Sequence, residues 1–246
     1  MERILACGLL LIAATGCGPR PQARQSPAGG AMLPGIHELT LETRAGAVDY
    51  TIVVPDGYRS ETPAPLIVAL HYGGEVTPFY GRGVIESLVA PGLSKLEAIV
   101  VAPDSLGGDW TTGDNEQAVL ELFEAVAAAY NIDRSKTLLT GFSMGGKGVW
   151  HLGSRHQDLF RAAIPIAGSP GASAPSDWRI PLYVINSDED EVMPLAVTER
   201  HVGILKSQGA DVHLEVVTGI SHYQTHKFAG PLRQAVPWVR RAWQRD

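Results

Sequence analysis

Residues 140–148, with the sequence TGFSMGGKG, match two motifs whose chemistries exclude one another. From Gly141 to Lys147 they fit G-x-x-x-x-G-K, which is most of a phosphate-binding loop. Around Ser143 they fit G-x-S-x-G, a nucleophile elbow. A phosphate-binding loop needs Ser or Thr directly after its Lys to coordinate magnesium, and Gly148 stands there instead. We therefore interpret this stretch as a nucleophile elbow.

The residues around Ser143 have the order of strand, turn and helix that an elbow requires. Residues 137–142 are predicted to form a strand, and a helix is predicted to begin at Met144. The turn at the nucleophile is strained, and side chains two positions away on either side would clash, so Gly141 and Gly145 suit it. The backbone N–H of Met144 would then point at the reaction zone from a helix N-terminus, which predicts an oxyanion donor.

A serine hydroxyl is barely ionised at neutral pH, so the elbow needs a base and an acid that orients the base. Residues 184–194, VINSDEDEVMP, follow a predicted strand and offer Asp188 and Asp190 among four carboxylates. His222, in the loop after the last predicted strand, and His226, four residues later, are the candidate bases. Such a histidine pair can also bind a metal, but no third ligand stands at a suitable spacing, so we predict no metal site.

A second oxyanion donor is expected in residues 70–74, LHYGG, which follow the third predicted strand. They are similar to the HGGG-type oxyanion segment, with Tyr72 where the first Gly usually stands. Backbone N–H donors survive that replacement because they do not depend on the side chain. Alignment on His71 favours Gly73 as the donor, with Tyr72 as the alternative.

From about residue 33 onward, the chain resembles the α/β-hydrolase superfamily. More narrowly, it resembles the bacterial esterase and predicted-peptidase branch that includes polyhydroxybutyrate depolymerases and feruloyl or acetylxylan esterases. Besides the acid and histidine loops, the resemblance rests on YNID at 130–133, LTGFSMGG at 139–146 and FRAAIPIAG at 160–168.

The resemblance implies a nucleophile, acid and base in that chain order, which are Ser143, Asp190 and His222. Asp190 is preferred because the Pro four residues later matches the family's acid loop, in which such a Pro begins a helix. The implied reaction is ester hydrolysis through an acyl-enzyme, with the N–H groups of Met144 and Gly73 as the oxyanion hole. It requires no metal or organic cofactor.

Short apolar runs alternate with longer helical patterns from residue 36 onward. This alternation predicts an α/β fold with a mostly parallel eight-stranded sheet and helices on both faces. Residues 37–44 and 47–55 are expected to open the fold as an antiparallel pair. The further strands are predicted at 66–71, 98–103, 137–142, 162–167, 182–186 and 212–217.

Helices are predicted over 115–130, 144–156, 194–208 and 231–243. Asp114 is the expected N-cap of the first of them. No insertion is long enough to form a large lid, and residues 77–94 are the best candidate for a loop that covers the pocket. Trp110 and Trp178 are expected either to line the site or to pack in the core.

The composition fits one globular domain. The 246 residues, of which 45% are hydrophobic and 19% charged, suffice for one core but are few for two domains. The formal net charge of −6 and the lack of clustered Lys and Arg argue against a nucleic-acid partner. A monomer is expected.

The N-terminus is expected to lie outside that domain. Residues 4–14 form an apolar run that is too short to cross a bilayer but long enough for a signal peptide. The small residues before Cys17 resemble a bacterial lipobox, which implies removal of residues 1–16 and lipid on Cys17. Ala14 stands where that motif more often has Leu, so ordinary secretory cleavage is the alternative.

Residues 17–35 are predicted to be a flexible tether, since they are rich in Pro, Gly and polar residues, and residues 36–246 the catalytic domain. Gly18 after the lipidated Cys17, in place of Asp, implies the outer membrane by resemblance to Gram-negative lipoproteins. With Cys7 in the signal peptide, the mature chain would have no free thiol and thus no disulfide or Cys nucleophile.

The sequence is compatible with three functions. A serine esterase that cleaves small or polymer-attached carboxylic esters is favoured. A serine peptidase of the same fold would use the same triad, and a catalytically inactive, lipid-anchored binding protein would use none of it.

Overall fold

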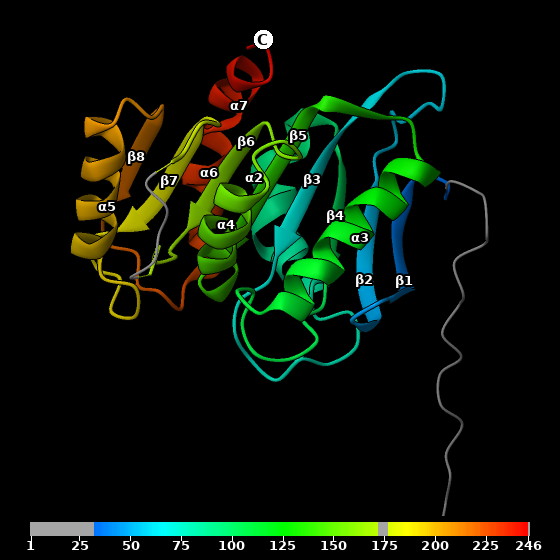
Figure 1. The fold of residues 1–246 in the computed structure, drawn as a ribbon, viewed down its shortest axis with the longest axis horizontal. Helices are drawn as coiled ribbons and strands as arrows, with labels where there is room; N and C mark the ends of the chain where they lie inside the picture. The colour runs from blue at the N-terminus through cyan, green and yellow to red at the C-terminus, as the bar shows by residue number, and fades with distance from the viewer. Residues whose placement is uncertain (1–31, 172–176, 246) are drawn as a thin grey trace, which may run out of the picture.

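An eight-stranded sheet organises the residues that the computed structural model describes, 32–171 and 177–245 (Figure 1). Its order is β1-β2-β4-β3-β5-β6-β7-β8, and β2 runs antiparallel to both of its neighbours while the remaining pairs are parallel. The predicted α/β fold with its opening antiparallel pair is therefore confirmed. The strands are β1 (Gly35–Thr43), β2 (Gly46–Val54), β3 (Ala64–Leu70), β4 (Ile99–Pro103), β5 (Ile132–Phe142), β6 (Ala162–Ile166), β7 (Leu182–Ser187) and β8 (Val212–Val217).

Helices cover both faces of the sheet. In Figure 1, α3 (Gly113–Ala129), α4 (Met144–Arg155) and α5 (Leu195–Ser207) lie in front of it. Behind it lie α2, α6 and α7, which belong to two helical segments of the chain. These segments comprise α1 (Arg82–Val84), η1 (Ile85–Val89), α2 (Ala90–Leu93) and η2 (Ser94–Leu96), and then η3 (Thr225–Phe228), α6 (Ala229–Gln234) and α7 (Val236–Ala242).

An apolar core lies between each helical layer and the sheet. Strand β3 contributes residues to both cores. Its alternate residues Leu66, Val68 and Leu70 belong to the core under α3, α4 and α5, while Ile67 and Ala69 belong to the opposite core. Strands buried on both faces are apolar at most positions, which is why their sequences read as nearly continuous apolar runs.

Trp110 and Trp178 pack in the first of these cores and are 0% and 4% exposed. The indole Nε1 of Trp110 donates to the backbone oxygen of His71 at 2.9 Å, and the ring of Trp178 lies 5.6 Å from that of Trp150. Of the two expectations for these tryptophans, core packing is therefore correct.

The expectation of a pocket-covering loop over residues 77–94 is wrong from Arg82 onward, because a helical run begins there. Gly83 and Pro91 are poor helix formers, which hid the run in the sequence. Tertiary packing overrides that preference. Ile85 and Leu88 are fully buried, and a Cβ on Gly92 would lie 2.8 Å from the side chain of Leu232 in α6.

Two further helix predictions need correction, one at its N-cap and one in its interior. Thr112, and not Asp114, is the N-cap of α3, because its extended backbone lets Oγ1 accept from the Asn115 N–H at 3.5 Å. Asp114 already lies in the first helical turn. The helix predicted over 231–243 is two helices, since Pro237 has no N–H to continue the ladder from α6 and instead lies in the first turn of α7.

Candidate active site

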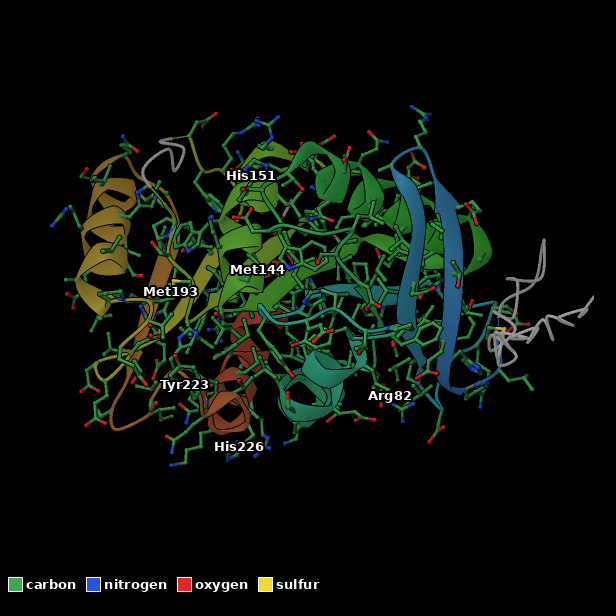
Figure 2. The ribbon with its side chains drawn as sticks, turned by 90° about the horizontal axis from the view of Figure 1, so that it is seen from below. Arg82, Met144, His151, Met193, Tyr223 and His226 are labelled. Atoms are coloured by element: carbon green, nitrogen blue, oxygen red, sulfur yellow. The ribbon has the colours of Figure 1, made fainter. Side chains whose placement is uncertain are left out.

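The site lies where the parallel strands end, at the lower edge of the sheet in Figure 1 and facing the viewer in Figure 2. Ser143 forms the turn between β5 and α4 with φ 56° and ψ −114°, a conformation that a residue with a Cβ rarely adopts. The turn is held on both sides. The Ser143 N–H donates to the oxygen of Ile166 at 3.0 Å, and its own oxygen accepts from the Lys147 N–H at 2.9 Å.

Glycines make this turn sterically possible. A Cβ on Gly141 would lie 2.6 Å from the carbonyl group of Gly145, and one on Gly145 would lie 2.0 Å from the oxygen of Leu70. These are the clashes with helix and strand that the elbow motif predicts. Gly146 and Gly148 are crowded too, with neighbours within 2.6 Å of an added Cβ, so α4 needs glycine at three positions near its start to pack closely.

Gly145→Ala is expected to lower the free energy of unfolding by about 4 kcal/mol, because the backbone of α4 or β3 must move to admit the methyl group. The matched control is Gly203→Ala in α5, where an added Cβ meets nothing within 4 Å. The control should gain about 0.5–1 kcal/mol from helix propensity. Urea denaturation followed by circular dichroism measures both, and equal midpoints for Gly145→Ala and wild type would contradict the crowding.

A histidine and a carboxylate continue from Ser143 in a chain of hydrogen bonds. His222 Nε2 lies 2.7 Å from Ser143 Oγ, and His222 Nδ1 lies 2.9 Å from both oxygens of Asp190. The carboxylate can only accept, so the ring proton is on Nδ1 and Nε2 is free to accept from the serine. The side chains of Asp190 and His222 are 0% and 6% exposed, which keeps this path out of water.

The loop after β7 aims Asp190 at the histidine. Its Oδ1 accepts from the backbone N–H groups of Val192 at 3.0 Å and Met193 at 2.7 Å, so the loop folds around the carboxylate. Asp188, the other candidate acid, is exposed and accepts from the Gly219 N–H at 3.2 Å. The structure thus brings Asp190, and not Asp188, to the histidine.

The loop after β8 carries the other end of the chain of hydrogen bonds. The ring of His222 packs against Phe142, with 5.3 Å between centroids, and against Tyr223 at 5.8 Å. His226 is exposed and lies on η3, at the outer rim of the view in Figure 2. Among the described residues, no group of three or more His, Cys, Asp or Glu side chains is arranged to hold a metal ion.

The segment after β3 is shaped by His71, which is fully buried. Its Nδ1 donates to the oxygen of Tyr72 at 2.7 Å, and its Nε2 accepts from the Ser105 N–H at 3.0 Å. Both contacts require a neutral ring with its proton on Nδ1. Burial lowers the pKa of His71 to about 4, against the smaller opposing effect of the bond to Tyr72. The ring therefore links this segment to the loop after β4 as a neutral group.

Lowering the pH should lower the stability of the protein because of His71. Between pH 6.5 and about 4 the unfolded chain binds a proton there that the folded protein does not, so acidification favours unfolding. The loss across this window is about 3 kcal/mol. Urea midpoints from pH 7 to 4.5 should vary less in His71→Gln than in wild type. The exposed His226→Gln is the control, and an unchanged pH dependence in His71→Gln would refute the assignment.

The two predicted oxyanion donors, Met144 and Gly73, lie close to each other. Met144 is the first residue of α4, so no carbonyl within the helix accepts its N–H. A Cβ on Gly73 would lie 3.9 Å from the Cβ of Met144, so the two backbones are adjacent, and Gly73 is exposed. The ring of Tyr72 turns inward and packs edge-on against Tyr80.

Two carboxylate contacts beside the site were not predicted from the sequence. Lys147, in the first turn of α4, binds Asp109 with 2.5 Å between Nζ and Oδ2. Although burial raises the pKa of Asp109, its hydrogen bonds from Lys147 and Thr111 outweigh this and lower it to about 2. Glu191 accepts from Ser221 and from the His222 N–H. The run of four acidic residues was the only sequence signal for it.

Comparison with known proteins places the chain in a family. A model of the dienelactone hydrolase family matches residues 103–245, which is more than half of the chain. The chain belongs to the dienelactone hydrolase family. Its fold is that of the α/β-hydrolase superfamily, as a crystallised thermostable esterase shows with a TM-score of 0.71 and 23% identity over 84% of this chain and 62% of that one.

Curated relatives of this dienelactone hydrolase family member include fungal enzymes. A probable feruloyl esterase C of Aspergillus niger is 28% identical over 215 residues, which are 80% of this chain and 71% of that protein. A protein of the same name from Aspergillus terreus is 32% identical over 161 residues, or 60% of this chain and 56% of that protein. The matched residues therefore span between 56% and 71% of the length of these relatives.

Proposed function

We propose that Ser143, His222 and Asp190 hydrolyse carboxylic esters by two-step acyl transfer. The chain is a carboxylic ester hydrolase, as its family and its esterase relatives indicate. The observation that carries the mechanism is the unbroken path of hydrogen bonds from Ser143 Oγ through the His222 ring to the Asp190 carboxylate. A hydroxyl beside a buried, acid-oriented imidazole is the arrangement that activates serine for attack on a carbonyl group.

In the first step, His222 Nε2 takes the proton of Ser143 as Oγ attacks the ester carbonyl carbon. Asp190 keeps its bond to Nδ1–H and stabilises the imidazolium ion that forms. The backbone N–H groups of Met144 and Gly73 bind the developing oxyanion, with Tyr72 as the alternative to Gly73. The imidazolium ion then protonates the leaving alcohol. In the second step a water molecule attacks the acyl-enzyme, with His222 again as the base.

The proposed substrates are small esters or acyl groups attached to a polymer, as in the esterase branch that the sequence resembles. Two observations support this class. The curated relatives are named feruloyl esterases, and the rim of the site carries exposed apolar side chains. Tyr223, beside His222, is 78% exposed, and Val192, beside the acid loop's Asp190, is 41% exposed. An exposed aromatic ring suits a flat acyl group or a polymer surface.

Turnover of a substrate panel tests the proposed function. Purified protein is assayed with p-nitrophenyl acetate, p-nitrophenyl butyrate, methyl ferulate and peptide p-nitroanilides, and labelled with a fluorophosphonate. Ester turnover together with labelling at Ser143 is the expected result. Faster turnover of the peptides would indicate the peptidase, and neither turnover nor labelling would indicate the inactive binding protein.

We also propose that the protein is exported and anchored to the cell envelope through lipid on Cys17. Residues 1–16, Cys17 and most of the tether lie outside the described residues, so this proposal rests on the sequence, as does the expected monomer. In the part of the chain that the structure describes, no helix is long and apolar enough to cross a membrane. Metabolic labelling with a palmitate analogue should be lost in Cys17→Ala, and retained label would exclude this anchor.

A further inference from the structure

Two neighbouring loops meet beside the proposed catalytic histidine. The acid loop follows β7 and the histidine loop follows β8, and these strands are paired in parallel. Close to the sheet, the Asp188 N–H donates to the oxygen of Val217 at 3.1 Å and the Gly219 N–H donates to Asp188 Oδ1 at 3.2 Å. Farther from the sheet, the backbone hydrogen bonds between β7 and β8 have ended. Side-chain contacts hold the two loops together there.

Glu191 of the acid loop contacts the histidine loop with both of its carboxylate oxygens. Oε1 accepts from the hydroxyl of Ser221 at 2.6 Å, and Oε2 accepts from the backbone N–H of His222 at 3.0 Å. The two donors belong to successive residues of the histidine loop. One carboxylate thus fixes the loop at two points and restrains the backbone from which the His222 ring projects.

Asp190 and Glu191 therefore hold the same histidine in complementary ways. Asp190 binds the ring at Nδ1, and Glu191 binds the backbone N–H of that residue. Rotation about the side-chain bonds is limited by the first contact and translation of the backbone by the second. Both are needed to keep Nε2 at 2.7 Å from Ser143 Oγ, because acyl transfer is sensitive to shifts of about 1 Å.

We propose that Glu191 is a positioning residue for ester hydrolysis, which ties the histidine loop to the acid loop and so holds His222 in line with Ser143. This role rests on the function proposed above. Glu191 touches neither the reacting atoms nor the imidazole ring, so its effect passes through His222.

The charge of Glu191 adds a smaller effect. Hydrogen bonds from Ser221 and from the His222 N–H, together with the charge of His222, keep the pKa of Glu191 below its usual value, so the side chain is ionised when the enzyme works. Among the described residues, two charged side chains interact with His222, namely Asp190 and Glu191. Glu191 is exposed, and water screens its charge, so we expect its charge to contribute less to catalysis than its hydrogen bonds.

Glu191→Ala, Glu191→Gln and Ser221→Ala test the proposal in the full-length protein. Glu191→Ala should lower kcat for p-nitrophenyl acetate and the rate of fluorophosphonate labelling about tenfold, with KM changed less than about twofold. Glu191→Gln keeps one acceptor oxygen and should lose about threefold, as should Ser221→Ala. Because both residues act through one contact, the double variant Glu191→Ala/Ser221→Ala should be no worse than Glu191→Ala.

The matched control is Glu189, an exposed carboxylate two residues earlier whose side chain makes neither contact. Glu189→Ala should retain wild-type kcat. Equal kcat in Glu191→Ala and Glu189→Ala, or a lower melting temperature of Glu191→Ala with unchanged kcat, would overturn the positioning role and leave a structural one.

Hydrogen exchange at the His222 amide gives a readout that does not need turnover. The amide should exchange faster in Glu191→Ala than in wild type or Glu189→Ala, because its acceptor is gone. Unchanged exchange would overturn the tie between the loops. If the wild type neither turns over esters nor reacts with the fluorophosphonate, the proposed function fails and with it the catalytic role of Glu191, while the exchange result still decides whether the tie exists.

Discussion

Ser143→Ala is expected to lower kcat for p-nitrophenyl acetate by roughly 10⁵-fold or more. The substitution removes the atom that forms the acyl-enzyme, and no second hydroxyl is bonded to His222 Nε2 among the described residues. The activity that is left would come from substrate binding and from the Met144 and Gly73 N–H groups, which do not depend on the serine side chain. Fluorophosphonate labelling should disappear completely.

The control for this loss is another serine on the same helix. Ser154, near the end of α4, donates to the oxygen of His151 at 2.8 Å and lies far along the chain from the elbow. Ser154→Ala should keep wild-type kcat and labelling. A melting temperature of Ser143→Ala equal to that of the wild type would show that the fold survives. Retention of more than about a tenth of wild-type kcat by Ser143→Ala would exclude Ser143 as the nucleophile.

Much of the fold follows from local rules that act over a few residues. Strands buried on both faces are mostly apolar, so every strand end except the start of β5 could be predicted to within two residues. β5 is the exception and begins at Ile132, five residues before its prediction, because its first half carries polar residues where it runs beyond the core. The elbow was recognisable because the clashes at Gly141 and Gly145 depend only on the strand and helix that adjoin them.

Features that depend on tertiary contacts could not be predicted in the same way. The helical run from Arg82 is stabilised by packing against α6, more than a hundred residues away in sequence. Among the four acidic residues after β7, the spacing to Pro194 favoured Asp190 as the acid, but the contacts of Asp188 and Glu191 are visible only in the folded loops. The partner of a carboxylate in one loop lies in the loop after another strand. Residue spacing within one loop therefore does not predict that partner.

Asp190→Asn should lower kcat by about 10⁴-fold, through the tautomer of the histidine. Asp190 Oδ1 accepts from the N–H groups of Val192 and Met193, and an asparagine can satisfy both only with its amide oxygen in that place. Its NH₂ group then faces His222 Nδ1 and donates to it. The ring proton is forced onto Nε2, which can no longer accept the proton of Ser143.

Asp188→Asn is the matched control, since it makes the same chemical change two residues away. Its amide oxygen can still accept from the Gly219 N–H, so kcat should stay within about twofold of wild type. The tautomer itself can be read from the ¹⁵N chemical shifts of the His222 ring, which should exchange their protonated and unprotonated values in Asp190→Asn alone. A large loss of kcat in Asp188→Asn with little loss in Asp190→Asn would reverse the assignment of the acid and require the loop after β7 to rearrange during turnover.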